Sequence, residues 1–351
     1  MYRLKIQNLH ALFEQFTKSA RLFLPIKCGD VAEHLISGGG DTQQKGSVNF
    51  TQWNSDVSPE SIDLVTLKTT KPPKEFFLPH FEELYSATNR ADGFDINPKP
   101  IPDAPFILFG VRACDFEGIG VLDRVYLSDP VDRFYEARRN TAAIFTLSCE
   151  SPTPTCFCNS FGIDPEDPGG DVSMWLTEDY LFMKPITEKG ADLMEPLKNI
   201  LEEAPPDIPF SHKPNPFIPV SSIDPESLIS SFNSDKWDSL HRSCISCGTC
   251  TFLCPTCQCY DISDFSTGET VRCHRTWDSC MYKDFTQMAH GNPRQSAKAR
   301  FRQRFMHKLL YHGEKHGDGF SCVGCGRCTN KCPVNLSIVK VIRALGANKN
   351  A

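Results

Sequence analysis

The sequence predicts an α+β multidomain protein, with a mixed α/β domain over residues 1–204 and a helical, cysteine-rich domain over residues 236–351. Short runs of β-branched and aromatic residues alternate with amphipathic stretches in the first part, as in mixed α/β folds. Six prolines fall within residues 205–220, a density that resists helix and sheet and marks residues 205–235 as a linker. Beyond this linker, 12 of the 17 cysteines lie within residues 244–332.

The N-terminal elements follow from the spacing of apolar residues. Apolar residues recur at helical spacing through residues 11–24, which predicts one amphipathic helix there. Residues 191–201 carry a leucine stripe, and Pro196 leaves open whether this helix starts at residue 191 or at the proline. The remaining predictions are strands over residues 62–67, 106–111 and 142–147, a hairpin over residues 172–185 and a loop at residues 38–41.

Charge divides the chain unevenly. Residues 290–351 contain 12 Lys and Arg against 2 Asp and Glu, a net charge of +10, although the whole chain carries −6. The rest of the chain is therefore acidic, and no nucleic-acid recognition motif accompanies the basic stretch, so nucleic acid is not an expected partner. No apolar run reaches the roughly 18–20 residues of a membrane span. The first residues lack a secretory signal pattern, so we expect a cytoplasmic protein with reduced cysteines.

Two cysteine runs share one pattern. Residues 244–255 and 322–333 both match C-x2-C-x2-C-x3-C-P, the run of bacterial two-cluster ferredoxins. Three thiolates spaced by two residues can bind one cubane, and the fourth thiolate reaches the other cubane. Zinc sites instead pair C-x2-C units across a longer gap, which makes zinc the weaker alternative. The predicted ligands are Cys244, Cys247, Cys250 and Cys332 for one [4Fe-4S] cluster, and Cys322, Cys325, Cys328 and Cys254 for the other.

The segment between the two motifs favours a particular kind of ferredoxin domain. It spans 67 residues, far more than small two-cluster ferredoxins use, and predicts an α-helical dicluster ferredoxin domain. Within it, residues 294–311 predict a helix with one apolar face and one face rich in Arg and Lys. Two interpretations of the basic face stay open: a solvated surface, or cations that compensate anionic clusters. We expect the histidines of this region, His307, His312 and His316, at the surface.

A third metal site is predicted in the N-terminal domain. Cys114 and Cys149 each follow a predicted strand, and Cys156 and Cys158 come shortly after Cys149. Two neighbouring strand ends would bring these four thiols together, enough for an iron–sulfur centre or for zinc. Unligated cysteines in a β-rich core are the alternative. The other cysteines are interpreted as structural or as part of an extra site (Cys257, Cys259, Cys273 and Cys280) or have no assigned role (Cys28).

Several strings in combination resemble a known family. They are Gly110-Val111-Arg112-Ala113-Cys114-Asp115, Thr155-Cys156-Phe157-Cys158, Cys254-Pro255-Thr256-Cys257-Gln258-Cys259, Trp277-Asp278-Ser279-Cys280 and Gly291-Asn292-Pro293-Arg294. With the two motifs, they resemble the iron–sulfur (β) subunits of soluble NAD(P)-linked nickel–iron hydrogenases, also called sulfhydrogenases. They equally resemble the A subunits of anaerobic sulfite reductases and related dicluster subunits linked to heterodisulfide reductases. The resemblance covers most of the chain.

The resemblance implies an electron-transfer subunit of a hetero-oligomeric oxidoreductase complex, without catalytic residues of its own. Its implied partners are a flavoprotein subunit that binds FAD and NAD(P), and a terminal catalytic redox subunit of the hydrogenase or heterodisulfide-reductase type. This chain has no G-x-G-x-x-G or P-loop fingerprint, as expected if a partner binds the nucleotide. The resemblance also strengthens the prediction of a third cluster. The alternatives are an A subunit of sulfite reductase, a self-contained iron–sulfur enzyme using Cys257, Cys259 and Cys280, and a redox-inert zinc module.

Overall fold

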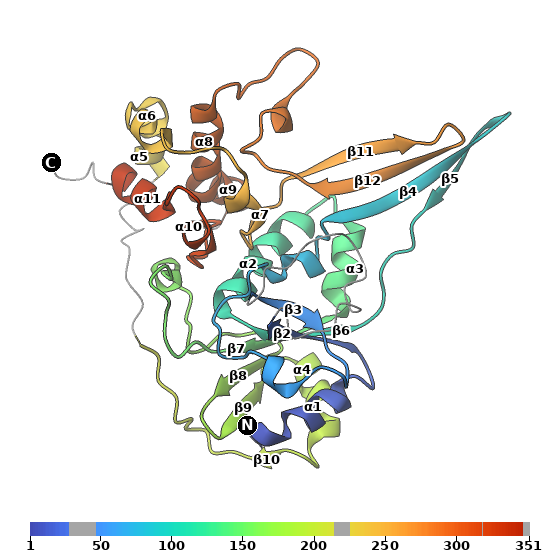
Figure 1. The fold of residues 1–351 in the computed structure, drawn as a ribbon, viewed down its shortest axis with the longest axis vertical. Helices are drawn as coiled ribbons and strands as arrows, with labels where there is room; N and C mark the ends of the chain where they lie inside the picture. The colour runs from blue at the N-terminus through green and yellow to red at the C-terminus, as the bar shows by residue number, and fades with distance from the viewer. Residues whose placement is uncertain (28–46, 214–224, 318, 347–351) are drawn as a thin grey trace.

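A computed structural model describes residues 1–27, 47–213, 225–317 and 319–346 (Figure 1). Its larger sheet has eight strands, of which four neighbouring strands run parallel to one another and the others pair antiparallel. In spatial order the strands are β10 (Glu202–Glu203), β1 (Tyr2–Lys5), β9 (Tyr180–Pro185), β8 (Val172–Leu176), β7 (Ala142–Leu147), β6 (Phe106–Val111), β2 (Arg21–Lys27) and β3 (Val48–Gln52).

The centre of this sheet is buried on both faces. Every residue of β6 and β7 is buried, and alternate residues enter opposite cores because side chains alternate across a strand. One core contains helices α1 and α4, and the other contains α2 and α3 (Figure 1). Because β6 and β7 run parallel, their carboxyl ends lie at the same edge of the sheet. The four helices are α1 (Leu9–Phe16), α2 (Ala113–Tyr126), α3 (Arg133–Thr141) and α4 (Glu188–Met194).

A second, four-stranded antiparallel sheet projects from the body of the molecule (Figure 1). Its spatial order is β11 (Tyr260–Ser266), β12 (Thr270–Trp277), β4 (Phe81–Arg90) and β5 (Gly93–Pro98). Strand β4 precedes the Pro-rich segment and β12 follows it, so both predicted domains contribute strands to one sheet. Glu82 of β4 forms ion pairs with Arg275 of β12 and Arg138 of α3, and these pairs tie the base of the sheet to the body.

Helices make up most of the C-terminal part. Ser296 caps the longest of those helices, since its side chain accepts a hydrogen bond from the Ala299 N–H (3.1 Å). Trp237, Phe301 and Val341 come from three different helices and meet in one apolar core. The elements are α5 (Pro225–Ser230), α6 (Lys236–His241), α7 (Thr249–Phe252), α8 (Ala297–Met306), a π-helical turn (His307–Tyr311), α9 (His312–His316), α10 (Arg327–Asn330) and α11 (Ile338–Gly346).

Strands β6 and β7 and the β8–β9 hairpin occur where the sequence predicts them, but one predicted strand is wrong. Within residues 62–67, only Ile62 makes a bridge, an isolated one to β2. The Asp63 carboxylate accepts hydrogen bonds from the N–H groups of Val65 and Thr66 (3.1 and 2.7 Å) and so holds a turn. Val65 is 77% exposed, because this turn directs it to solvent.

The predicted helix over residues 11–24 is in fact two elements. Helix α1 ends at Phe16, and β2 starts at Arg21. Leu22 and Leu24 are buried with the period of two that a strand requires, and the helical spacing of neighbouring apolar residues masks this signal. The predicted helix near Pro196 also differs, because α4 ends at Met194 and a 3-10 turn with the proline at its start follows.

Two predictions fall partly or wholly outside the described residues. The loop at residues 38–41 lies outside them, and so does Cys28. In the predicted linker over residues 205–235, the described residues 205–213 contain no helix or strand, whereas residues 225–235 include α5 and bury Leu228 in the apolar core of the C-terminal helices. No helix in the described ranges combines the length and apolar character needed to cross a membrane.

Candidate iron–sulfur sites

The two cysteine motifs adopt the same backbone conformation. In each motif a glycine with positive φ, Gly248 or Gly326 (both 75°), directly precedes a one-turn helix, α7 or α10. Two residues earlier, Ser246 and Gly324 also have positive φ (56° and 61°). Such left-handed residues turn the chain sharply within the space between two cysteines. The repeat in the sequence is therefore a repeat in the structure, and α7 and α10 contact one another.

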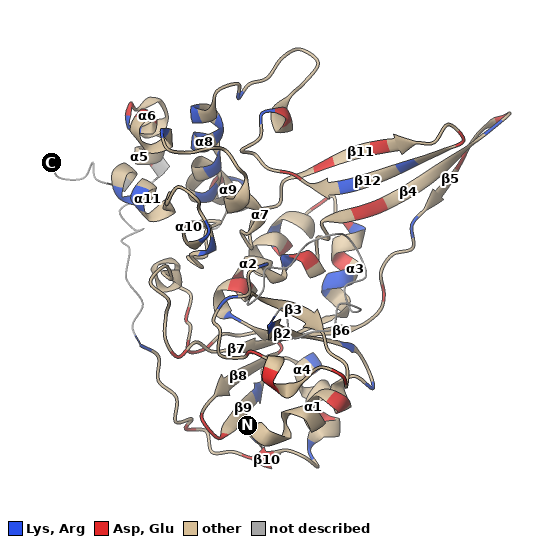
Figure 2. Cartoon of the chain, in the orientation of Figure 1, with Lys and Arg blue, Asp and Glu red and all other residues tan. Residues whose placement is uncertain are grey.

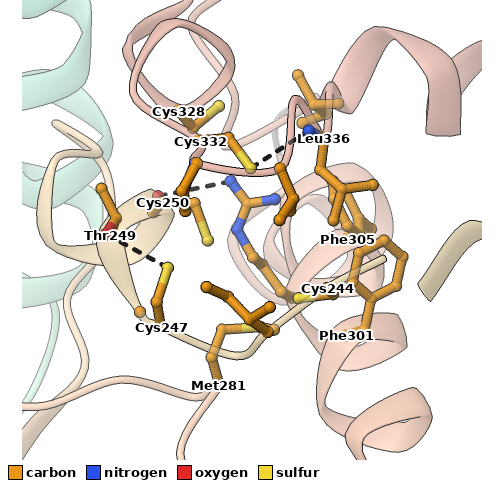
Figure 3. A pocket seen from close by; sticks show the side chains of 16 residues that line it. Cys244, Cys247, Thr249, Cys250, Met281, Phe301, Phe305, Cys328, Cys332 and Leu336 are labelled. Atoms are coloured by element: carbon orange, nitrogen blue, oxygen red, sulfur yellow. Dashed lines mark hydrogen bonds between the residues drawn. The ribbon is translucent and has the colours of Figure 1, made fainter. Parts of the chain in front are cut away.

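The first candidate site is a mostly apolar pocket with about 490 Å³ of empty space. Its wall contains the predicted ligands of the first cubane, and Figure 3 shows their sulfur atoms around the space. The Ser246 N–H donates to the Cys244 sulfur (3.4 Å), and the Leu336 N–H donates to the Cys332 sulfur (3.2 Å). Backbone donors thus stabilise negative charge on sulfur. The cysteines of the wall are Cys244, Cys247, Cys250, Cys328 and Cys332.

Arg304 supplies a buried positive charge at this pocket. The residue is 5% exposed and lines the pocket, and one of its terminal nitrogens donates weakly to the Cys250 carbonyl (3.5 Å). Its Nε atom has no hydrogen-bond partner among the described residues. Burial raises the pKa of the Cys250 thiol to about 11, and the Arg304 charge opposes that shift. A buried guanidinium with an unused donor beside five cysteines fits an anionic iron–thiolate group.

The second candidate ligand set also comes together from both motifs. Burial raises the pKa of Cys322, and it raises that of Cys325 to about 12; negative charge on Cys254 adds to both shifts. Lys308 is 3% exposed and donates hydrogen bonds to the Thr256 hydroxyl and to the Ser321 carbonyl (3.5 Å). Burial alone would lower the pKa of Lys308, but negative charge on Cys254 and neighbouring thiols raises it.

The third candidate site lies at the edge of the larger sheet where β6 and β7 end. It is a small pocket lined by the four cysteines predicted to form it, Cys114, Cys149, Cys156 and Cys158. Arg112 follows β6 and donates to the Ser148 carbonyl after β7 (2.6 Å), which holds the two strand ends together. The geometric expectation is therefore met, while metal binding by these cysteines stays a prediction.

The third pocket and the second motif are in direct contact. Cys325 also lines this pocket, and the Phe157 N–H donates to the Gly324 carbonyl (2.9 Å). A Cβ atom at Gly326 would lie 2.1 Å from the Thr155 carbonyl oxygen, so only glycine permits this approach. Lys68 donates to both the Thr153 hydroxyl (2.7 Å) and the Cys325 carbonyl (2.8 Å).

A buried ion pair fixes the same contact. Asp115 of α2 and Arg327 of α10 have side chains 2% and 3% exposed, and Nη2 of the arginine lies 2.7 Å from Oδ2 of the carboxylate. Arg327 lies between two cysteines of the second motif, so the pair links that motif to the helix that carries Cys114. Sequence reasoning missed this role, although the position of the arginine inside the motif was a usable signal.

The basic face of the predicted helix over residues 294–311 is partly buried. Lys and Arg recur along α8 (Figure 2), but Arg300 is 9% exposed, Arg304 5% and Lys308 3%. Of the two interpretations of the basic face, compensation of anionic clusters therefore fits Arg304 and Lys308 better than a solvated surface. The surface prediction is wrong for His312, which directly follows the π-helical turn and is 1% exposed.

The remaining cysteines divide into two groups. The neighbouring Cys254 raises the pKa of the Cys257 thiol, and the neighbouring Cys280 lowers the pKa of the Cys259 thiol to about 7. Cys273 pairs with Tyr85 across β12 and β4, in the projecting sheet.

Among the described residues, no three His, Cys, Asp or Glu side chains are close enough to hold a single metal ion. In a cubane, by contrast, each thiolate binds a different iron.

These sites and their scaffold define an iron–sulfur protein. A family model described as a 4Fe-4S dicluster domain matches residues 243–336. Among curated proteins, the sulfhydrogenase 2 subunit beta of Pyrococcus furiosus is 32% identical over 326 residues, covering 86% of this chain and 90% of that protein. The chain belongs to the sulfhydrogenase beta-subunit family, as its sequence strings predict. No solved structure matches the chain significantly.

Proposed function

We propose that this chain is an electron-transfer subunit in which an α-helical domain over residues 236–351 holds two [4Fe-4S] clusters. The observation that carries the proposal is the crossed ligand set, because Cys332 of the second motif lines the pocket of the first motif. The first cluster would use Cys244, Cys247, Cys250 and Cys332, and the second would use Cys322, Cys325, Cys328 and Cys254. A bound cubane accepts and releases one electron at a time.

A third cluster on Cys114, Cys149, Cys156 and Cys158 would complete a path through the chain. Cys325 borders the third pocket, and Cys328 borders the first pocket, so ligands of the second cluster contact both neighbours. Arg304, Lys308 and Lys68 place positive charge along this path and favour the reduced, more negative forms. At the far end Cys247 is exposed, which supports electron exchange with a partner there.

Two observations support the proposed partners: the missing nucleotide-binding fingerprint and the name of the related protein. The sequence has no nucleotide fingerprint, which supports a separate FAD- and NAD(P)-binding flavoprotein subunit as one partner. The related protein is by name a subunit of a sulfhydrogenase, which supports a terminal hydrogenase-type catalytic subunit as the other. Exposed apolar side chains on the projecting sheet support a hetero-oligomeric assembly: Phe94 (66%), Ile96 (63%), Ile262 (53%) and Phe265 (63%). We assign the complex to the cytoplasm, where its thiols stay reduced.

Iron and acid-labile sulfide per chain, measured on anaerobically purified protein, test this proposal. About eight irons support two cubanes, and about twelve support the third cluster as well. Cys114→Ser should then remove about four irons and leave the EPR signals of the two motif cubanes. Bound zinc with no iron would refute the proposal, and steady substrate turnover by the purified chain alone would refute a purely electron-transferring role.

A further inference from the structure

The segment that follows β10 returns to the third pocket and places a histidine in its wall. His212 lines this pocket together with the four cysteines predicted to bind a third cluster. Residues 205–213 contain no helix or strand, so regular backbone pairing does not hold the histidine there. Its position depends instead on individual hydrogen bonds to the rest of the wall.

Three hydrogen bonds attach this segment beside the pocket. The His212 N–H donates to the Glu166 carboxylate (2.8 Å), and the Lys213 N–H donates to the Glu150 carbonyl (2.8 Å). The imidazole Nδ1 atom of His212 is hydrogen-bonded to the carbonyl of Cys149, the residue directly before Glu150. Both the backbone and the ring of the histidine are therefore fixed next to a cysteine of the third site.

The bond to the Cys149 carbonyl decides which ring nitrogen carries a proton. A carbonyl oxygen can only accept a hydrogen bond, so Nδ1 is the donor, and in the neutral ring Nε2 has a lone pair and no hydrogen. The Nε2 atom of His212 is buried, and no described residue forms a hydrogen bond with it. Histidines that bind metals have this arrangement, because one ring nitrogen donates to a carbonyl or carboxylate and the other binds the metal.

The two cations of the pocket wall are engaged elsewhere and do not serve this lone pair. Arg112 donates to the Ser148 carbonyl (2.6 Å), and Lys68 donates to the Cys325 carbonyl (2.8 Å). A buried acceptor without a partner is costly, since it has lost its hydrogen bonds to water. Iron held by the neighbouring thiolates would satisfy the Nε2 lone pair of His212.

We propose that His212 is an iron ligand at the third site and binds one iron of the cluster through Nε2. The inference rests on the proposed third cluster and refines its ligand set. The wall supplies five donors, four thiols and one imidazole, whereas the four irons of a cubane take four. One of the four cysteines therefore stays a spare thiol. Imidazole is neutral where a thiolate is anionic, so the reduction potential of this cluster is higher than with four thiolates.

Pulsed EPR of the reduced, anaerobically purified full chain tests the proposal, with 15N introduced only into the histidine rings. The signal of the third cluster is the one that Cys114→Ser removes. It should show the hyperfine coupling of an iron-bound 15N nucleus, and this measurement on the unsubstituted chain does not depend on a variant folding. A third-cluster signal without that coupling would overturn the proposal.

A pair of variants identifies the histidine. His212→Ala should lose the 15N coupling, keep about twelve irons because the spare cysteine takes the vacant position, and lower the potential of the third cluster. His241→Ala is the matched control, because His241 also donates from Nδ1 to a backbone carbonyl, that of Trp237 (2.8 Å), but does not line the third pocket. It should keep both the coupling and the potential.

Two results separate failure of this ligand from failure of the third cluster. Persistence of the coupling in His212→Ala, or about twelve irons in the unsubstituted chain with no coupling, would refute the ligand alone. About eight irons in the unsubstituted chain would refute the third cluster and this ligand with it.

Discussion

Gly118→Ala probes the packing of helix α2 against the end of the first cysteine motif. A Cβ atom at Gly118 would lie 2.9 Å from Cβ and 3.3 Å from Cγ of Pro255. The proline ring is rigid and follows Cys254 directly, so it cannot turn away as a long side chain would. The substitution therefore forces either α2 or the motif end to move.

Gly120→Ala supplies a matched control two residues along the same helix. Its added Cβ would have only the ends of two flexible side chains near it, at 3.8 and 3.9 Å. Both substitutions gain helix propensity, about 0.5–1 kcal/mol each, so this contribution cancels in the comparison. Overpacking a tight contact costs about 1–3 kcal/mol. Gly120→Ala should therefore stabilise the protein, and Gly118→Ala should be about 1–3 kcal/mol less stable than Gly120→Ala.

Anaerobic thermal unfolding of the two holoprotein variants measures this difference. One kcal/mol shifts Tm by about 2–4 °C in domains of about 150–250 residues, so the two variants should differ by at least about 2 °C. Gly118→Ala should also weaken iron retention at the second site, because the displaced proline adjoins Cys254. Equal stabilisation of both variants, with full iron in both, would refute the close contact between α2 and the motif.

Three further substitutions test other contacts. Asp115→Asn leaves the buried Arg327 guanidinium unpaired and should lower the apparent free energy of unfolding in urea by about 3–5 kcal/mol; a loss below about 1 kcal/mol would contradict a buried pair. Arg304→Gln removes a buried cation at the first pocket, so the reduced cluster loses stabilisation and its potential should fall by tens of millivolts in an EPR redox titration. An unchanged potential would place that cation away from the cluster. Ile96 lies on the exposed strand β5, so Ile96→Lys should weaken co-purification with partner subunits without lowering the Tm of the chain. A complex that stays intact would exclude this face of the projecting sheet from the interface.

The fold was predictable from the sequence where a short segment has one clear pattern, such as a continuous apolar run or a polar turn between two apolar runs. Strands β6 and β7 are fully buried apolar runs of six residues, and the polar turn between β8 and β9 marks the hairpin. The region from Leu12 to Leu24 was not predictable by spacing alone, because helical and strand periods overlap there. The composition of residues 62–67 favours a strand, but backbone N–H groups that donate to the Asp63 carboxylate hold a turn there instead.

The sequence by itself determined the chemistry of the two motifs, because coordination geometry requires cysteines at short, regular intervals that are visible along the chain. It also indicated the third group of cysteines, since carboxyl ends of neighbouring parallel strands meet at one sheet edge. Only the tertiary structure decided which cations face the thiols. Lys308 and Thr256 are distant in sequence, and no local pattern records the hydrogen bond that Lys308 donates to the Thr256 hydroxyl, which lies 3.2 Å from the Cys254 sulfur. Packing of distant segments creates that site, because the free energy of a buried charge depends on all the groups around it.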